Sequence, residues 1–265
     1  MPIRSARCVA KATLLSLPLI LLALAPLRAE QSGPTPYPDG KADAAWPGKG
    51  PIRIFGWMPE NRKAFWSKRE ADHGKIVFTG DSIIGGWKLE KDFAGQPVVN
   101  RGIGGDVTRG LLFRFQEDVL DLQPKAIVIH IGGNALTAAG SVADVVQNYN
   151  AILDLAQKAN PATPIIILAV TPHGIPTTGD KVPSADLAKY LAKVNALIPL
   201  LDKELVKIAE TRKNVTYVDS YSAFLKPDGS LDESLFNSDL VHPTDAGHTK
   251  LGELVSKALH DVKAL

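Results

Sequence analysis

The chain has 265 residues, and its 30 lysines and arginines nearly balance 28 aspartates and glutamates, which gives a formal net charge of +2. Hydrophobic residues make up 45% and charged residues 22% of the sequence, as is ordinary for a soluble globular protein. A chain of this length can bury a sufficient core in a single domain.

Residues 1–29 have the pattern of a secretory signal peptide. Three basic residues precede an apolar run at 12–26, and the small residue Ala29 closes the segment. The run is shorter than the apolar stretch that a membrane-spanning helix needs. Without this leader, which holds four basic and no acidic residues, the net charge becomes −2, so a basic nucleic-acid-binding face is not expected. The sequence predicts an exported protein, periplasmic or secreted, without a stable membrane anchor.

Cys8 is the single cysteine, and it precedes the apolar run of the leader. A lipoprotein cysteine would follow that run, so Cys8 is a poor anchor. Cleavage after residue 29 would leave 236 residues without any cysteine. Cysteine catalysis, zinc–thiolate sites, iron–sulfur clusters and disulfides are then all excluded for the mature chain.

Residues 30–51 are rich in Pro, Gly and Asp and predict an extended N-terminal arm, tied to the body by Tyr37 and Trp46. Residues 52–265 are expected to form a single domain. A helix is predicted over residues 61–70. The aromatic residues in this region are interpreted as a stripe that faces the core: Phe55, Trp57, Phe65 and Trp66.

Short apolar runs alternate with helical periodicity from residue 75 onward. Strands are predicted at residues 75–79, 98–100, 126–131, 164–170 and 215–218. Helices are predicted at residues 107–121, 142–160, 186–211 and 244–263. The third and fourth strands are nearly continuous in β-branched residues, which is typical of parallel strands covered on both faces. The pattern predicts an α/β fold, a flavodoxin-like three-layer α/β/α sandwich around a five-stranded parallel sheet.

Polar residues follow the predicted strands, where such sheets bind their ligands. After the first strand comes Gly80-Asp81-Ser82-Ile83. Ser82 would begin a helix there, and it would offer both a hydroxyl nucleophile and a backbone N–H without a helical partner. The alternative is an ordinary Asp/Ser helix cap.

Glycine-rich turns follow the next two strands. Gly102, Gly104 and Gly105 would let backbone N–H groups approach a ligand. A nucleotide-binding loop is the alternative, but Val107 stands where its last glycine is needed. After the third strand, the turn at Gly132-Gly133 is followed by Asn134, whose amide would point inward or only serve the turn.

Asp239 and His242 lie three residues apart before the last predicted helix. In one local turn, the carboxylate can hold one imidazole nitrogen so that the other faces a serine. Half of a metal site is the alternative. No metal is expected, because the three histidines available as further ligands show no ligand spacing with His242: His130, His173 and His248.

These four clusters resemble the motifs of the SGNH hydrolase superfamily, also called GDSL esterases, which carry Ser, Gly, Asn and His in this order. Residues 100–114 look most similar to the branch of platelet-activating-factor acetylhydrolase subunits and bacterial acetylesterases. The resemblance runs from about residue 75 to the last residue. Ala135 departs from it, because the family usually has Asp after the Asn.

The resemblance implies the SGNH fold and a serine ester hydrolase that forms an acyl-enzyme without a metal or organic cofactor. It implies a catalytic triad of Ser82, His242 and Asp239. It also implies an oxyanion hole built from the N–H groups of Ser82 and Gly105 and the side-chain amide of Asn134.

The expected substrate is a short acyl ester, acetyl first, on a small molecule or polysaccharide, and most readily on a carbohydrate. A lipid or lysophospholipid ester or a thioester is the alternative. Two other classes stay open: a ligand-binding module without catalysis, because fold does not fix function, and a metal-dependent phosphodiesterase.

Two substrate contacts are predicted near the site. Trp87 follows Ser82 and is either an aromatic platform for a sugar ring or a packed tryptophan. His173 lines the pocket or faces solvent. Arg101 and Arg109 would contact an anionic group or pair with Asp106.

Overall fold

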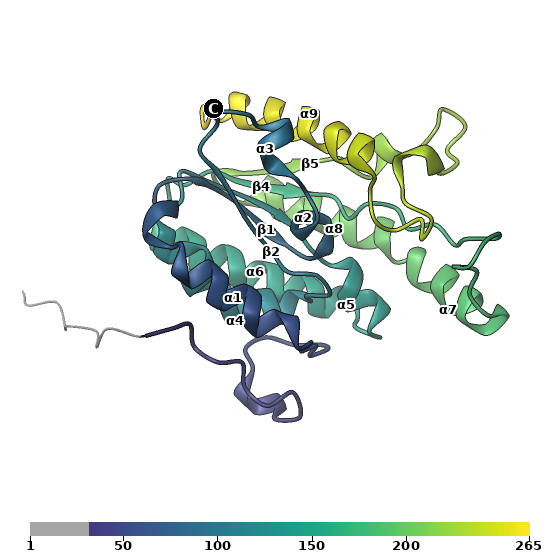
Figure 1. The fold of residues 1–265 in the computed structure, drawn as a ribbon, viewed down its shortest axis with the longest axis horizontal. Coiled ribbons are helices and arrows are strands. Elements are labelled where there is room, and N and C mark those ends of the chain that lie inside the picture. Colours follow the sequence, from purple (N-terminus) through teal and green to yellow (C-terminus); the bar gives the residue numbers. More distant parts are fainter. Residues whose placement is uncertain (1–31) are drawn as a thin grey trace, which may run out of the picture. The chain divides into compact units, whose positions relative to one another are not determined.

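Five parallel strands form the sheet, in the order β2-β1-β3-β4-β5 (Figure 1). In the register, Gly80 at the end of β1 stands beside Gly102 of β2 and beside His130 of β3. The segments that follow these three strands therefore emerge along one edge of the sheet. The strands are Ile76–Gly80 (β1), Val98–Gly102 (β2), Ala126–His130 (β3), Ile165–Leu168 (β4) and Val215–Val218 (β5).

The computed structural model describes residues 32–265, of which Gly33–Leu265 form one unit. The predicted signal peptide and Cys8 lie outside the described residues. Within residues 32–265, no helix is both long and apolar enough to cross a membrane. The same residues contain no group of three His, Cys, Asp or Glu side chains that could hold a metal ion.

Helices cover both faces of the sheet (Figure 1). Val77 and Ile127 pack on one face with α4, α6 and α8, while Phe78 and Val128 pack on the other with α2, α3 and α9. Neighbouring strand residues point to opposite faces, so both faces need apolar side chains. The helices are α1 (Trp57–Ser67), α2 (Ser82–Gly85), α3 (Leu89–Asp92), α4 (Thr108–Asp118), α5 (Gly133–Thr137), α6 (Val142–Ala159), α7 (Ala185–Asn195), α8 (Ile198–Thr211) and α9 (Asp245–Asp261).

The predicted fold class is confirmed, with all five strands present and parallel. The single helix predicted over residues 186–211 is wrong, because α7 ends at Asn195 and α8 begins at Ile198. Pro199 lies in the first turn of α8, where its missing N–H has no helical partner to lose. A continuous helix would have needed that N–H.

The segment before α1 lies on α4 through aromatic and charged contacts. Tyr37 and Trp46 stack at 5.7 Å, and both rings contact Phe113 of α4. Arg109 donates hydrogen bonds to the Asp43 carboxylate and to the carbonyl oxygen of Pro47. These contacts join the N-terminal segment to the helix that follows β2.

The expected pairing of Arg101 or Arg109 with Asp106 is wrong. Arg109 binds the N-terminal segment, and Arg101 donates to Asp72 Oδ2 at 2.9 Å. Arg101 is only 2% exposed, so it is not available to an anionic ligand. Both arginines therefore hold chain segments together.

Asp202 on α8 makes the stability of the protein depend on pH. Its Oδ1 accepts the N–H of Val170 at 3.1 Å, while its buried Oδ2 has no partner among the described residues. Burial raises the pKa of Asp202 to about 7. In the unfolded chain an aspartate ionises near pH 3.9, so between about pH 4 and pH 7 the unfolded state loses this proton first. The contribution of Asp202 to stability is therefore full below about pH 4 and lost as the pH rises through 7.

We expect Asp202→Asn to remove this fall, because a neutral amide can accept the same hydrogen bond without ionising. Urea unfolding at pH 5 and pH 8 measures it. From pH 5 to pH 8, the free energy of unfolding should fall by on the order of 2 kcal/mol more in the wild type than in Asp202→Asn. Equal losses in both proteins would contradict the assignment.

Candidate active site

Ser82 begins α2 just after β1, which ends in a glycine whose backbone conformation leaves no room for a side chain. Gly80 has a φ of +149°, and a Cβ at this position would come within 1.8 Å of the carbonyl oxygen of His130. The side chain of Asp81 caps α2 by accepting the N–H of Ile83 at 3.0 Å. Asp81 thus serves as the cap, and the hydroxyl of Ser82 is left for another partner.

That partner is His242, although 160 residues separate the two in the sequence. The distance from His242 Nε2 to Ser82 Oγ is 2.8 Å, and that from His242 Nδ1 to Asp239 Oδ2 is 2.7 Å. Because an ionised carboxylate only accepts hydrogen bonds, Nδ1 donates to Asp239 and Nε2 is left to accept from the serine. The three side chains form the hydrogen-bonded chain that a serine nucleophile needs.

The turn that carries Asp239 keeps its carboxylate ionised. Partial burial works to raise the pKa of Asp239, but hydrogen bonds from His242 and from the N–H of Val241 outweigh it and hold the pKa below its usual value. Leu240 lies between Asp239 and Val241. It has a φ of 55°, and its carbonyl oxygen accepts the N–H of Gly174 at 2.7 Å. A carboxylate of low pKa stabilises a charged imidazole without taking its proton.

The loop after β2 lies beside Ser82. A Cβ at Gly104 would be 3.9 Å from the Cβ of Ser82. Gly105 has a φ of +81°, and a Cβ there would come within 2.6 Å of the ring of Phe55. The left-handed backbone and the covering ring both require glycine at position 105. The loop therefore brings backbone N–H groups close to the serine.

The amide of Asn134, on α5, is fixed from both ends. Its Nδ2 donates to the carbonyl oxygen of Asp106 at 3.1 Å, and its Oδ1 accepts from Arg53 Nη1 at 3.3 Å. One Nδ2 hydrogen is left over for a ligand oxygen. The next residue, Ala135, is 1% exposed and has no polar side chain that could hold the Asn134 amide. Arg53 helps to orient this amide instead. Sequence reasoning missed Arg53, because no motif surrounds it.

We expect Asn134→Ala to lower kcat for p-nitrophenyl acetate by roughly 10²- to 10³-fold, because one donor to the oxyanion is lost. The protein should stay folded by circular dichroism. Asn150→Ala is the matched control. The Asn150 side chain hydrogen-bonds only to Val146, on the same helix α6, and to Arg212, at the end of α8. An unchanged rate in Asn134→Ala would make Asn134 a turn residue only.

Comparison with known proteins places these residues in a family. A sequence profile described as the GDSL-like Lipase/Acylhydrolase family matches residues 78–250, which include Ser82, Asn134 and His242. The chain belongs to this family. The human platelet-activating factor acetylhydrolase IB subunit alpha2 is 28% identical over 212 residues, which cover 78% of this chain and 82% of the relative.

Solved structures share the fold of this GDSL hydrolase. A GDSL-like lipase from Bacteroides thetaiotaomicron superposes with a TM-score of 0.61 at 23% identity and covers 77% of this chain and 98% of the other. A catalytic mutant of an acetylxylan esterase from Geobacillus stearothermophilus gives a TM-score of 0.51 at 23% identity, with 72% and 94% covered. The family and its esterase relatives show that the protein is a carboxylic ester hydrolase.

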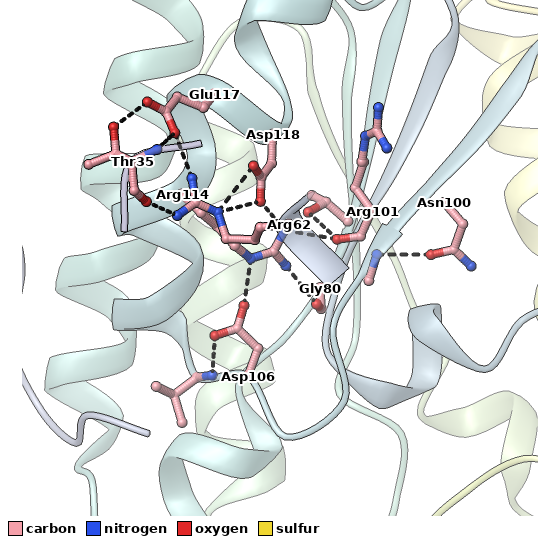
Figure 2. Close-up of polar contacts among 12 residues, drawn as sticks. Thr35, Arg62, Gly80, Asn100, Arg101, Asp106, Arg114, Glu117 and Asp118 are labelled. Atoms are coloured by element: carbon pink, nitrogen blue, oxygen red, sulfur yellow. Dashed lines mark hydrogen bonds and ion pairs between the residues drawn. The ribbon is translucent and has the colours of Figure 1, made fainter. Parts of the chain in front are cut away.

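A buried arginine of the GDSL hydrolase joins the end of β1, just before Ser82, to the loop after β2 (Figure 2). Arg114 of α4 is fully buried and donates to Asp106 Oδ2 at 2.8 Å. It also donates to the carbonyl oxygens of Gly80 at 3.0 Å and Arg101 at 2.9 Å. Gly80 lies two residues before Ser82, so one side chain holds the ends of β1 and β2 and the loop after β2.

One carboxylate beside Arg114, that of Asp118, is shared with a second arginine (Figure 2). Arg62 of α1 donates to both oxygens of Asp118 and to Glu117 Oε2, and Arg114 reaches Asp118 Oδ2 at 3.4 Å. Burial raises the pKa of Asp106 to about 6, although Arg114 opposes the rise. A buried carboxylate of this kind depends on its arginine partner to stay charged.

His173 lies at the site. A Cβ at Gly133 would come within 2.8 Å of His173 Cε1, and His173 lines a mainly apolar cavity of about 450 Å³ together with Asn134 and Asp239. Burial lowers the pKa of His173 to about 4, so the ring is neutral at neutral pH. The other walls of the cavity are formed by the segment after β4 and by α7, including Val182, Pro183, Leu187 and Leu191.

Trp87 is not at the site, and the expectation that it receives a sugar ring is not met. It is 3% exposed, packs edge-on against Phe78 and stacks on His248 at 5.5 Å. The core interpretation of the aromatic stripe is also wrong, because Trp57 is 52% exposed. Residues of α3 and α9 cover Trp87, whereas Trp57 stands at the exposed start of α1.

Proposed function

We propose that this carboxylic ester hydrolase removes short acyl groups, acetyl first, from carbohydrate alcohols by an acyl-enzyme mechanism. The single observation that carries the mechanism is the pair of hydrogen bonds at 2.8 Å and 2.7 Å that connects Ser82, His242 and Asp239. The predicted leader adds the proposal that the enzyme acts after export.

The steps follow from this geometry. Ser82 Oγ attacks the ester carbonyl while His242 Nε2 takes its proton, and Asp239 stabilises the imidazolium. The N–H groups of Ser82 and Gly105 and the Nδ2 of Asn134 receive the oxyanion. His242 then gives the proton to the leaving alcohol. Water, activated by the same imidazole, cleaves the acyl-enzyme and releases the acid.

The names of one sequence relative and one structural neighbour support acetyl as the acyl group. One names a platelet-activating factor acetylhydrolase and the other an acetylxylan esterase, so both include acetyl although their alcohols differ. The second shares only the fold with this chain. It supports no more than that this fold is compatible with a sugar ester.

A second candidate is an ester of a longer acyl chain or a lysophospholipid. The cavity of about 450 Å³ beside Asn134 favours it, because its walls are mainly apolar and larger than an acetyl group requires. A thioester of similar size would fit the same cavity.

A substrate panel separates the two candidates. We expect kcat/KM to be highest for acetylated sugars, and to fall from acetyl to butyryl to octanoyl in p-nitrophenyl esters. Preference for octanoyl esters or lysophospholipids would overturn the sugar assignment and favour the second candidate. Activity that survives EDTA supports the metal-free mechanism, and activity abolished by EDTA contradicts it.

A further inference from the structure

An exposed tryptophan stands beside the nucleophile. The indole of Trp57 is 52% exposed, the highest value among the large hydrophobic residues exposed in residues 32–265. A Cβ built at Gly104 would lie 3.8 Å from Trp57 Nε1 and 3.9 Å from the Cβ of Ser82. The indole and the serine thus both lie next to Gly104, in the loop after β2. Trp57 lies outside residues 78–250, the span that the family profile matches.

The indole is held in one orientation. Its Nε1 donates to the carbonyl oxygen of Gly104 at 2.9 Å, and Phe55 stacks on it with centroids 4.6 Å apart and an interplanar angle of 10°. Phe55 in turn covers Gly105 and lies beneath the guanidinium of Arg53. Since Phe55 covers one face of the indole, the exposed area belongs largely to the other face. A ring already fixed in place loses little freedom when a ligand stacks on it.

We propose that the open face of Trp57 is the platform on which the sugar ring of the leaving alcohol stacks. This inference rests on the proposed function and specifies its alcohol subsite. Aromatic side chains combine a large apolar face with a polar group, and here the polar group is already used on Gly104. A pyranose offers an apolar C–H face to the indole and hydroxyl groups to nearby donors. Arg53 is such a donor, and it makes no ion pair with any residue in 32–265.

The cavity and the platform divide the ester between them. The cavity touches Asn134 and Asp239 but is not lined by Trp57 or Phe55. An acyl group ends at its last carbon and fits a mainly apolar cavity of limited volume, whereas an oligosaccharide continues beyond the ester and needs an open surface. The cavity therefore takes the acyl group and the platform takes the sugar.

The test compares two acetyl esters, a mono-O-acetylated methyl pyranoside and methyl acetate, which has no ring. For Trp57→Ala, we expect the ratio of kcat/KM for the pyranoside to that for methyl acetate to fall by about five- to tenfold, mainly through KM. Trp57→Phe keeps an aromatic face but loses the N–H bond to Gly104, and it should retain most of the ratio. Trp66→Ala, on the same helix, is the matched control and should change neither rate.

An unchanged ratio in Trp57→Ala overturns the platform. If both rates also fall equally in Trp57→Ala and in Trp57→Phe, Trp57 acts only through the Gly104 loop. Calorimetric titration of the pyranoside into Ser82→Ala and into Ser82→Ala/Trp57→Ala tests the platform without turnover, where we expect at least fivefold weaker binding in the double variant. If the wild type cleaves methyl acetate but no sugar ester, the proposed substrate fails, and equal titration curves would then reject the platform as well.

Discussion

Ser82→Ala is expected to lower kcat for p-nitrophenyl acetate by about 10⁴- to 10⁶-fold while the protein stays folded. The hydroxyl is the only atom group removed, and it lies 2.8 Å from His242 Nε2. Asp81 caps α2 through its own side chain, so the helix does not depend on the serine hydroxyl. Stopped assays at high enzyme concentration measure the residual rate, and thermal unfolding measures the fold.

A fluorophosphonate probe gives an independent readout of the same residue. Ser82 Oγ would form a bond to phosphorus and fluoride would leave with the serine proton as HF, so the wild type should gain the mass of one probe less HF and Ser82→Ala none. Ser67→Ala is the control, because Ser67 is an exposed serine whose hydroxyl only bonds the carbonyl oxygen of Ala64. Turnover or labelling retained in Ser82→Ala would remove Ser82 from the mechanism.

Arg114→Met is expected to lower the free energy of unfolding by about 3–5 kcal/mol, because it leaves the buried carboxylate of Asp106 without its counter-ion. The carbonyl oxygens of Gly80 and Arg101 lose their donors as well. Asp118 is affected less, because Arg62 still reaches it. Urea unfolding at pH 7.5 measures the loss, and kcat should fall in the fraction that remains folded.

Arg212→Met is the matched control for Arg114→Met. Arg212 makes three hydrogen bonds to side chains, to Asp154, Gln157 and Asn150, but its carboxylate partner is 68% exposed. An ion pair with an exposed partner contributes little, so we expect a loss of less than about 1 kcal/mol. Equal losses in the two variants would contradict a special role for the cluster around Arg114.

The local sequence pattern was sufficient to predict the strands whose two faces are both covered by helices. The runs at 126–131 and 164–170 are apolar because helices cover both faces of β3 and β4, and this constraint is visible in the sequence. The helix start predicted at Ser82 is confirmed by α2, but its short length was not predicted, and neither were α3 and α5. With four or five residues each, they show no helical period, and the turns at the edge of the sheet determine them.

The motif residues of the candidate site could be found because each follows a strand or precedes the last helix. Trp57 and Arg53 could not, since they reach the site from a segment without any motif. Arg114 did leave a signal. It shares a helix with Leu111 and Phe115, both buried, and an arginine among such neighbours indicates a buried partner. Trp87 shows the opposite failure, because its distance from Ser82 in the sequence says nothing of what covers it.

The separation of 160 residues between nucleophile and base has a consequence for biosynthesis. A nascent polypeptide that has emerged as far as β5 already contains Ser82, Gly105 and Asn134, but it lacks His242, the imidazole that contacts the serine hydroxyl. Ester cleavage therefore begins only after His242 has been synthesised and has docked.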